Sequence, residues 1–144
     1  MAHKVEELPI HTKVVAFWRA INATLEHSKL RRDSEAYEQI SRANDSIPSN
    51  LVEGFEQSTD KSFANFVGYS KGSLAEVLKR LRKAYYRRLV TADELRTHLE
   101  AGEELGKMLG GVHEVPAQER LQGPRLAEAA AGAKGKEAPQ VSSA

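Results

Sequence analysis

The chain has 144 residues, of which 40% are hydrophobic, and this is enough to build one domain around a single core. It contains no cysteine, which excludes a disulfide framework, a thiolate metal site and a thiol nucleophile, and which fits a reducing cytoplasm. The formal net charge of +1 hides a segregation, because segment 33–60 sums to −6, segment 61–90 to +7 and segment 91–123 to −4.

The N-terminal segment 1–9 does not resemble a signal peptide. It carries Glu6 and Glu7 where a signal peptide needs an apolar core. No apolar run approaches the roughly 18 residues of a membrane span. We therefore expect a cytoplasmic protein without a membrane partner, in which segment 1–9 is an extension to the folded domain.

The first predicted helix covers residues 10–29. Its apolar residues recur with the three-and-four spacing of an amphipathic helix, and they are Val14, Phe17, Trp18, Ile21 and Leu25. We expect Phe17 and Trp18 to be core anchors. The basic run 29–32 breaks the pattern, and Asp33 or Ser34 can cap the next helix by accepting hydrogen bonds from its first turn.

The second predicted helix covers residues 34–57 and contains Pro48. Its apolar side keeps one phase from Tyr37 through Ile47 to Phe55, across the proline. Because a helix that stopped at Pro48 would not be held in register beyond it, we predict one helix that is kinked at Pro48. The proline removes one ladder hydrogen bond, at a cost of about 3 kcal/mol in a regular helix. We expect small polar side chains nearby to bond freed backbone groups, and Gly54 either to admit a neighbouring helix or to begin a cap.

Two further helices are predicted, over residues 60–88 and 91–110. The third begins at Ser58, Thr59 or Asp60, and its apolar stripe comprises Phe63, Phe66, Val67, Leu74, Val77, Leu78, Leu81 and Tyr85. Gly68 and Gly72, one turn apart, leave a smooth patch on it. The fourth helix is capped by Thr91 and ends at a pair of glycines.

The C-terminal tail, residues 114–144, is rich in alanine, glycine and proline and is predicted to be disordered. Short connections between helices favour antiparallel neighbours. The sequence therefore predicts an all-α fold, an antiparallel up-down-up-down four-helix bundle over residues 10–113.

Two segments of this bundle carry a resemblance to a known family. Segment 39–54 reads QISRANDSIPSNLVEG, and segment 63–76 reads FANFVGYSKGSLAE. In this order and at this separation they resemble the signature of the four-helix bundle family named for 23S rRNA intervening-sequence proteins. The matching motif positions are Ile47, Pro48, Asn50, Glu53, Gly54, Gly72 and Glu76. The chain departs from the pattern at Ser41, where a second base is usual, and at Asp45, where a small or apolar residue is common.

The resemblance implies assembly of several bundles into a ring, with the pentamer as the usual homo-oligomer. It implies no established enzymatic activity and no cofactor. Members are encoded inside insertions in large-subunit rRNA genes and at other loci, and the related accessory proteins of diversity-generating retroelements bind nucleic acid. The missing base at Ser41 and the added acid at Asp45 make the middle of the second helix more acidic, which weakens the case for its contact with phosphate.

The main candidate site is a basic cluster near the end of the third helix. It comprises Lys79, Arg80, Arg82, Lys83, Tyr86, Arg87 and Arg88. On the predicted helix Lys79, Arg80, Lys83 and Arg87 form an outward stripe, with Arg82 and Tyr86 on its flank. Such a stripe can neutralise the phosphates of RNA or DNA, and an exposed tyrosine can stack on a base. The alternative is that the bases pair with acidic helices or form a solvated face.

Other sites are weaker. The Pro48 motif either bends the second helix or forms a ligand site from Asn50 and Glu53. If the protein were an enzyme, its active site would need these two residues and Arg42 together in one pocket. The five histidines are scattered, Glu53 and Glu76 lack the Glu-x-x-His partners of a bundle metal site, and phosphate-binding and nucleophile motifs are absent. We predict no catalytic residue, no metal and no cofactor. The leading hypothesis is a non-enzymatic, ring-forming protein that binds nucleic acid, and the alternative is a protein-protein adaptor.

Overall fold

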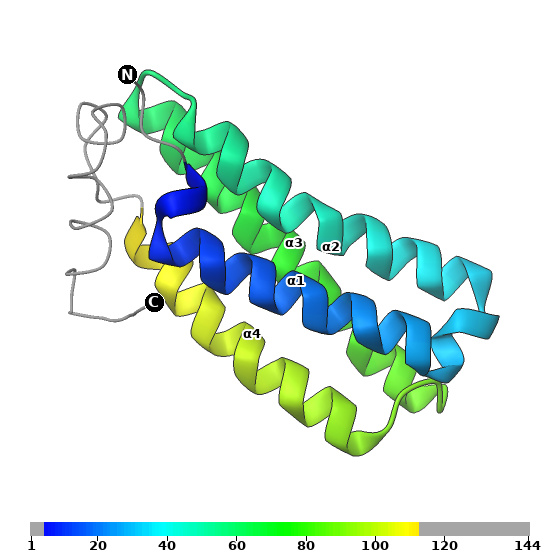
Figure 1. Cartoon of the computed structure of the whole chain (residues 1–144). Helices are drawn as coiled ribbons and strands as arrows, with labels where there is room; N and C mark the ends of the chain where they lie inside the picture. Colours follow the sequence, from blue (N-terminus) through cyan, green and yellow to red (C-terminus); the bar gives the residue numbers. More distant parts are fainter. Residues whose placement is uncertain (1–4, 113–144) are drawn as a thin grey trace.

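The computed structural model describes residues 5–112, and every regular element in that range is helical (Figure 1). The elements are η1 (Val5–Glu7), α1 (Pro9–His27), η2 (Lys29–Arg32), α2 (Ser34–Phe55), α3 (Asp60–Tyr86) and α4 (Ala92–Val112). Each end of α1 to α4 lies within about two residues of the predicted one, which is the usual uncertainty of a helix boundary. The predicted disordered tail lies outside the described residues.

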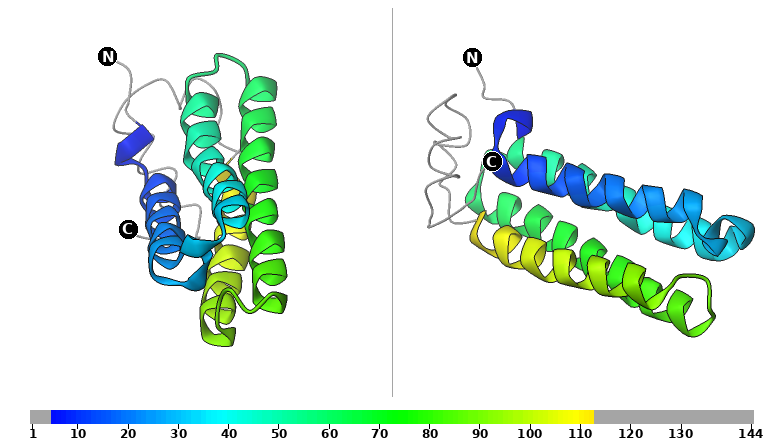
Figure 2. Two further views of the ribbon diagram at one scale, coloured as in Figure 1. Left: turned by 90° about the vertical axis from the view of Figure 1, so that its right-hand side faces the viewer. Right: turned by 60° about the horizontal axis from the view of Figure 1, so that its bottom comes forward.

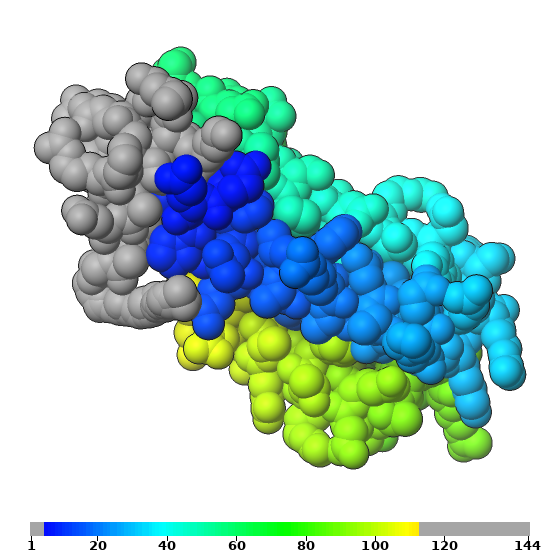
Figure 3. All heavy atoms as spheres, viewed as in Figure 1, coloured from blue at the N-terminus to red at the C-terminus, as the bar shows by residue number. Residues whose placement is uncertain are grey.

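The four long helices run alternately up and down and pack as a bundle (Figures 1 and 2). Each contacts the next along the chain, and α1 closes the arrangement against α4. The α1–α2 and α3–α4 connections lie at one end of the bundle, and the α2–α3 connection lies at the other (Figure 1). The predicted all-α, four-helix fold is confirmed, and side chains fill the space that the ribbons leave between α1 and α4 (Figure 3).

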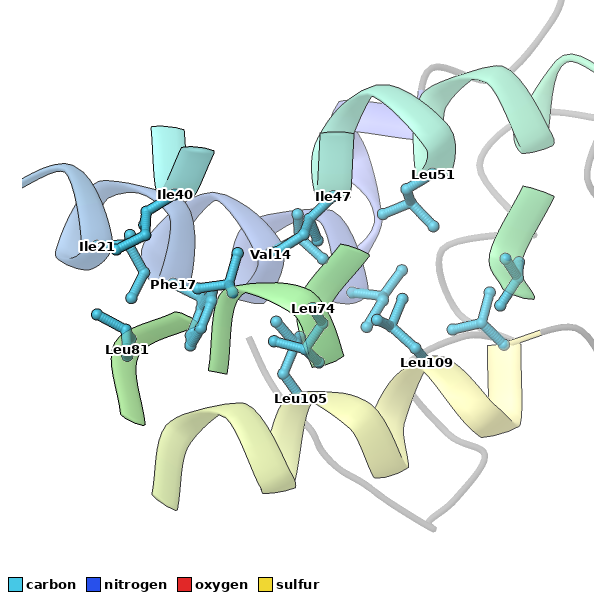
Figure 4. Close-up of a cluster of buried hydrophobic side chains, with 14 of the residues drawn as sticks. Val14, Phe17, Ile21, Ile40, Ile47, Leu51, Leu74, Leu81, Leu105 and Leu109 are labelled. Carbon is cyan, nitrogen blue, oxygen red and sulfur yellow. The ribbon is translucent and has the colours of Figure 1, made fainter. Parts of the chain in front are cut away.

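The core is built from the apolar stripe of each helix (Figure 4). The labelled core side chains are Val14, Phe17, Ile21, Ile40, Ile47, Leu51, Leu74, Leu81, Leu105 and Leu109. All ten are buried, as the three-and-four spacing requires. Trp18 departs from the prediction because it is only half-buried; its indole Nε1 donates a 2.8 Å hydrogen bond to Asp45 Oδ1 on α2.

Three of the four long helices, α2, α3 and α4, start with a side-chain cap. Asp33 Oδ1 accepts from the Ala36 N–H at 3.1 Å, and Thr59 Oγ1 accepts from the Ser62 N–H at 3.1 Å. At the start of α4, Thr91 Oγ1 accepts from the Glu94 N–H, while the Glu94 carboxylate accepts from the Thr91 N–H. This reciprocal pair is a capping box. The first turns therefore begin where the sequence predicts.

Helix α2 continues through Pro48, as predicted. Polar side chains on both sides of the proline bond backbone carbonyls that precede it: Ser46 Oγ donates to Arg42 O at 3.1 Å, and Asn50 Nδ2 donates to Ser46 O at 2.9 Å. From α3, the buried Ser70 hydroxyl donates to Ile47 O at 2.8 Å. These bonds tie the proline turn to its own helix and to α3.

Gly54 lies at a close approach of α2 and α3. A Cβ at this position would be 3.0 Å from Phe66 Cβ and 3.4 Å from Phe63 Cδ1. Glycine is therefore needed for the close approach of α3, which was one of the two predicted roles. Phe55 and Phe63 meet edge to face beside it, with ring centroids 5.1 Å apart.

Candidate nucleic-acid interface

One face of α3 carries bases toward solvent. The buried side of this helix includes Leu74, Val77, Leu81 and Ala84. The opposite side presents Lys79, Arg82, Lys83 and Tyr86, which follow one another at i, i+3, i+4 and i+7 and are all exposed. We call these four residues the exposed basic face. Its position follows from the apolar stripe, because the two occupy opposite sides of one helix.

Arg80 and Arg87 do not lie on this face, which corrects the predicted outward stripe. The Arg80 side chain is 29% exposed; its Nε pairs with Glu76 Oε2 at 2.6 Å, and its Nη1 donates to Gln39 Oε1 on α2 at 2.6 Å. Arg87 Nη2 pairs with Asp33 Oδ2 at 2.6 Å. Both arginines turn toward α2 because that helix supplies acceptors within their reach. Arg82 and Tyr86, predicted for the flank, take the outward positions instead.

The contact between Arg87 and Asp33 joins the two connections at one end of the bundle. The Ala36 N–H and the Arg87 guanidinium both hold the pKa of Asp33 below its ordinary value, with the Ala36 hydrogen bond as the larger cause. Asp33 thus caps α2 and binds the end of α3 with the same carboxylate. This arginine serves the fold, as the alternative interpretation of the basic cluster expects.

The bases of the exposed basic face are barely neutralised. Lys79 Nζ is 3.8 Å from Glu76 Oε1, but the Lys79 side chain is 77% exposed and Glu76 already pairs with Arg80. Arg82 and Lys83 form no ion pair with any residue between positions 5 and 112. An exposed pair at this distance contributes little. The face therefore keeps a net positive charge that is available to an anion.

Two tyrosines extend this face at the end of α3. Tyr86 is 79% exposed and Tyr85 is 37% exposed, with their ring centroids 5.7 Å apart and their planes inclined by 54°. Tyr85 was predicted to belong to the core; instead the small Ala84 fills the buried position. Arg88 follows with φ of 65°, a left-handed conformation that turns the chain out of the helix toward α4.

Sequence reasoning missed a second source of positive charge at this end. Lys29 and Arg32 of η2 are exposed, while Leu30 between them is fully buried and anchors the short helix. The α1–α2 connection lies at the same end as the α3–α4 connection (Figure 1). The run 29–32 was interpreted only as a break between helices, although the antiparallel order predicts that alternate connections share an end.

Three of the seven family-motif positions, Asn50, Gly72 and Glu76, line a groove between α2 and α3 rather than the basic face. This groove, of about 630 Å³, includes Arg42, Asn50, Gly72 and Glu76 among its lining residues. A Cβ on Gly72 would meet nothing within 4 Å, so the glycine patch is open. Glu53 is exposed and does not line the groove. The pocket that an enzyme would need from Arg42, Asn50 and Glu53 is therefore not assembled here.

His98 is buried between α1 and α4. Its Nε2 is 2.7 Å from Thr24 Oγ1, and its ring meets Phe17 edge to face, with centroids 6.5 Å apart. Burial lowers the pKa of His98, which outweighs the opposing effect of Glu94. Among residues 5–112 no group of three or more histidine, aspartate or glutamate side chains is placed to hold a metal ion. His113 lies outside the described range.

Buried Asn44 was not foreseen as a polar link. Its Nδ2 donates to Trp18 O at 3.0 Å and to Asn22 Oδ1 at 3.1 Å, both on α1. Together with the bond between Trp18 and Asp45, these contacts join α1 to α2. Asp45, at which the chain departs from the usual family pattern, therefore has a structural role.

The helix order, the core and the proline-containing helix define a four-helix bundle protein. In a comparison with known families, the chain matches the model of the 23S rRNA-intervening sequence protein family over residues 6–111. The chain belongs to this family, as the two sequence segments indicated.

A solved structure shares the fold. The chain is similar to a protein of unknown function from the S23 ribosomal protein family of Bacteroides thetaiotaomicron VPI-5482, with a TM-score of 0.64 and 18% sequence identity. The match covers 74% of this chain and 99% of that one. No curated protein matches the chain. None of the helices between residues 5 and 112 is long and apolar enough to cross a membrane.

Proposed function

We propose that this protein is a non-catalytic binding protein of the cytoplasm that assembles into a pentameric ring and contacts nucleic acid through the exposed basic face of α3. The observation that carries the proposal is the division of the basic cluster. Arg80 and Arg87 are held by α2, whereas Arg82 and Lys83 are exposed and free of ion pairs with the described residues. Pairing of Arg82 and Lys83 in the same way would instead have favoured a role in the fold alone.

Phosphate contact is the chemistry that such a face fits best. Lysine and arginine side chains that neutralise phosphates release condensed counterions, and this makes binding depend on salt. Lys79 and Tyr86 are seven positions apart, so the face extends about 10 Å along the helix. Repetition of this short face around a ring would add binding strength without new contacts in any one subunit.

The ring itself is proposed from the family resemblance, and light scattering tests it separately. A mass of five subunits is expected for the full chain. If the protein has the mass of a monomer, the proposed ring is wrong. Binding of phosphate by the exposed basic face would still be tested by the salt series.

A protein-protein adaptor is the alternative function. The open groove beside Gly72 favours it, because this part of α2 and α3 is not covered by any other described helix. In that case the oligomer would keep its mass when RNA or DNA is added, and a protein would be its partner.

The decisive experiment is a salt series with fluorescent RNA and DNA, both single-stranded and duplex. We expect affinity to fall steeply with salt and to drop when Lys79, Arg82 and Lys83 are changed together to glutamine. Loss of three phosphate contacts should reduce the slope of the logarithm of the binding constant against the logarithm of the salt concentration by about 2 to 3. A control in which Lys13, Lys61 and Lys107 become glutamine removes the same charge from other exposed positions. The proposal would be contradicted if both triple variants lost the same affinity for nucleic acid, or if the wild type did not bind at low salt.

A further inference from the structure

We infer that the basic end of the bundle binds single-stranded nucleic acid, with an unpaired base stacked on Tyr86. This inference rests on the proposed contact of the exposed basic face with nucleic acid and names the form that fits. Exposed aromatic rings lie here among exposed bases, and this combination suggests the ligand.

Large exposed aromatic side chains are few in residues 5–112. They are Tyr69, Tyr85 and Tyr86. Tyr86 is the most exposed of them at 79%, and the 54° inclination to Tyr85 means that the two rings do not cover each other face to face. An aromatic ring that is mostly exposed to water can offer a face to another planar group.

The charges around Tyr86 select the kind of planar group. Arg82 and Lys83 lie one helical turn before it, and Arg88 lies two residues after it. Several acids at this end already have partners: Asp33 pairs with Arg87, Glu26 with Arg31 and Asp93 with Arg96. A ligand with phosphates beside a ring therefore matches the site better than a neutral aromatic compound.

The basic end of the bundle also includes the neighbouring connection, η2, which lies at the same end (Figure 1). Its exposed bases without an ion pair in the described range are Lys29, Arg32, Arg82, Lys83 and Arg88. The contact of Arg87 with Asp33 brings the end of α3 beside the start of α2, next to η2. A flexible strand can follow bases that are distributed over two connections.

Base stacking distinguishes a single strand from a duplex. In a duplex the bases are paired and stacked on one another, so an external tyrosine cannot reach a base face without unstacking it. In a single strand each base can leave its neighbour and lie on an aromatic ring, and base identity matters little because every base has a π-face. An exposed tyrosine thus adds affinity for a single strand and adds little for a duplex.

The test compares the full-length wild type with Tyr86→Ala and Tyr86→Phe by fluorescence anisotropy. The probes are single-stranded RNA, single-stranded DNA and the corresponding duplexes, each of about 20 nucleotides, longer than the roughly 4–16 nucleotides of single-strand sites in one domain. Tyr69→Ala is the matched control, since Tyr69 is 56% exposed on the same helix but lies about 25 Å from Tyr86 along its axis. Circular dichroism confirms that each variant is folded.

We expect the wild type to prefer single strands to duplexes. Tyr86→Ala should weaken single-strand binding about fivefold or more, the lower end of the loss measured for one stacked base, while Tyr86→Phe and Tyr69→Ala stay near the wild type. Similar affinity for RNA and DNA would show that the base face and phosphate suffice; tighter RNA binding would add the 2′-hydroxyl to the contacts.

Two results would overturn the inference in different ways. If the wild type binds duplexes as tightly as single strands and Tyr86→Ala has no effect, the basic face binds phosphate without stacking, so only the single-strand inference fails. If no probe binds even at low salt, the proposed function fails, and the single-strand site fails with it.

Discussion

The close approach of α2 and α3 at Gly54 can be tested with a single methyl group. In Gly54→Ala the new Cβ would lie 3.0 Å from Phe66 Cβ, 3.4 Å from Phe63 Cδ1 and 3.5 Å from Phe63 O. Because Phe66 Cβ and Phe63 O are fixed to the backbone, only a shift of α3 relative to α2 can relieve these contacts. Overpacking of this kind costs about 1–3 kcal/mol.

Gly72→Ala is the matched control, since a Cβ there meets nothing within 4 Å. In the middle of a helix the change from glycine to alanine stabilises by about 1 kcal/mol. Gly54 is one residue from the end of α2, so it gains less from this effect. We therefore expect Gly54→Ala to lower the free energy of unfolding by about 1–2 kcal/mol and Gly72→Ala to raise it by about 0.5–1 kcal/mol.

The assay is thermal and denaturant unfolding followed by circular dichroism, at equal protein concentration because assembly shifts apparent stability. At about 4 °C per kcal/mol for a domain of this size, the two variants should melt about 8 °C apart. Equal melting temperatures for Gly54→Ala and Gly72→Ala would refute the argument that Gly54 is required by helix packing.

Further predictions concern the proline turn and the buried histidine. Pro48→Ala restores a backbone N–H, and we expect the oligomer mass from light scattering to change while helicity is kept; unchanged mass and stability would count against the predicted kink. Ser70→Ala removes the hydroxyl that donates to Ile47 O and should cost about 0.5–1.5 kcal/mol in denaturant unfolding, whereas no loss would mean that the bond adds nothing. Burial lowers the pKa of His98 from 6.5, so the unfolded chain binds more protons and stability should fall as the pH drops below 6.5. His98→Gln should make this fall smaller, though not abolish it because the pKa of His11 is lowered in the same direction; an unaltered pH profile would contradict the assignment.

The helices were predictable because each carries a continuous apolar phase. In α2 the phase runs from Ile40 through Ile47 to Leu51, all buried, so the sequence showed that Pro48 does not end the helix. Caps were also visible, since Asp33 and Thr91 precede amphipathic segments and accept hydrogen bonds from their first turns. These are local signals, and they decide where a helix begins and which side is buried.

Contacts between helices could not be predicted in the same way. Periodicity placed Arg80 and Arg87 outside the core, but it could not show that Gln39 and Asp33 of α2 lie close enough to hold them. Tyr85 was misplaced for a related reason, because a bulky residue at the edge of the apolar stripe is buried only if a neighbouring helix covers it. Periodicity therefore placed the basic cluster on α3 but assigned two of its bases, Arg80 and Arg87, to the wrong side of the helix.

Polar pairs between helices were the least accessible to sequence reasoning. The bond between Thr24 and His98 joins residues 74 positions apart, and the bond between Trp18 and Asp45 joins residues 27 positions apart. Neither residue type nor spacing marks such a pair before the helices are packed. They became visible only when the bundle placed α1 against α4 and α2.

The central claim is that the exposed basic face touches nucleic acid. Lysine footprinting tests it most directly: the full-length protein is acetylated with and without single-stranded RNA at low salt, and modified sites are quantified by mass spectrometry. We predict protection of Lys79 and Lys83, with Lys13 and Lys107, which are also exposed and lie on α1 and α4, labelled as before. Uniform labelling of all four lysines under conditions in which RNA is bound would contradict the account.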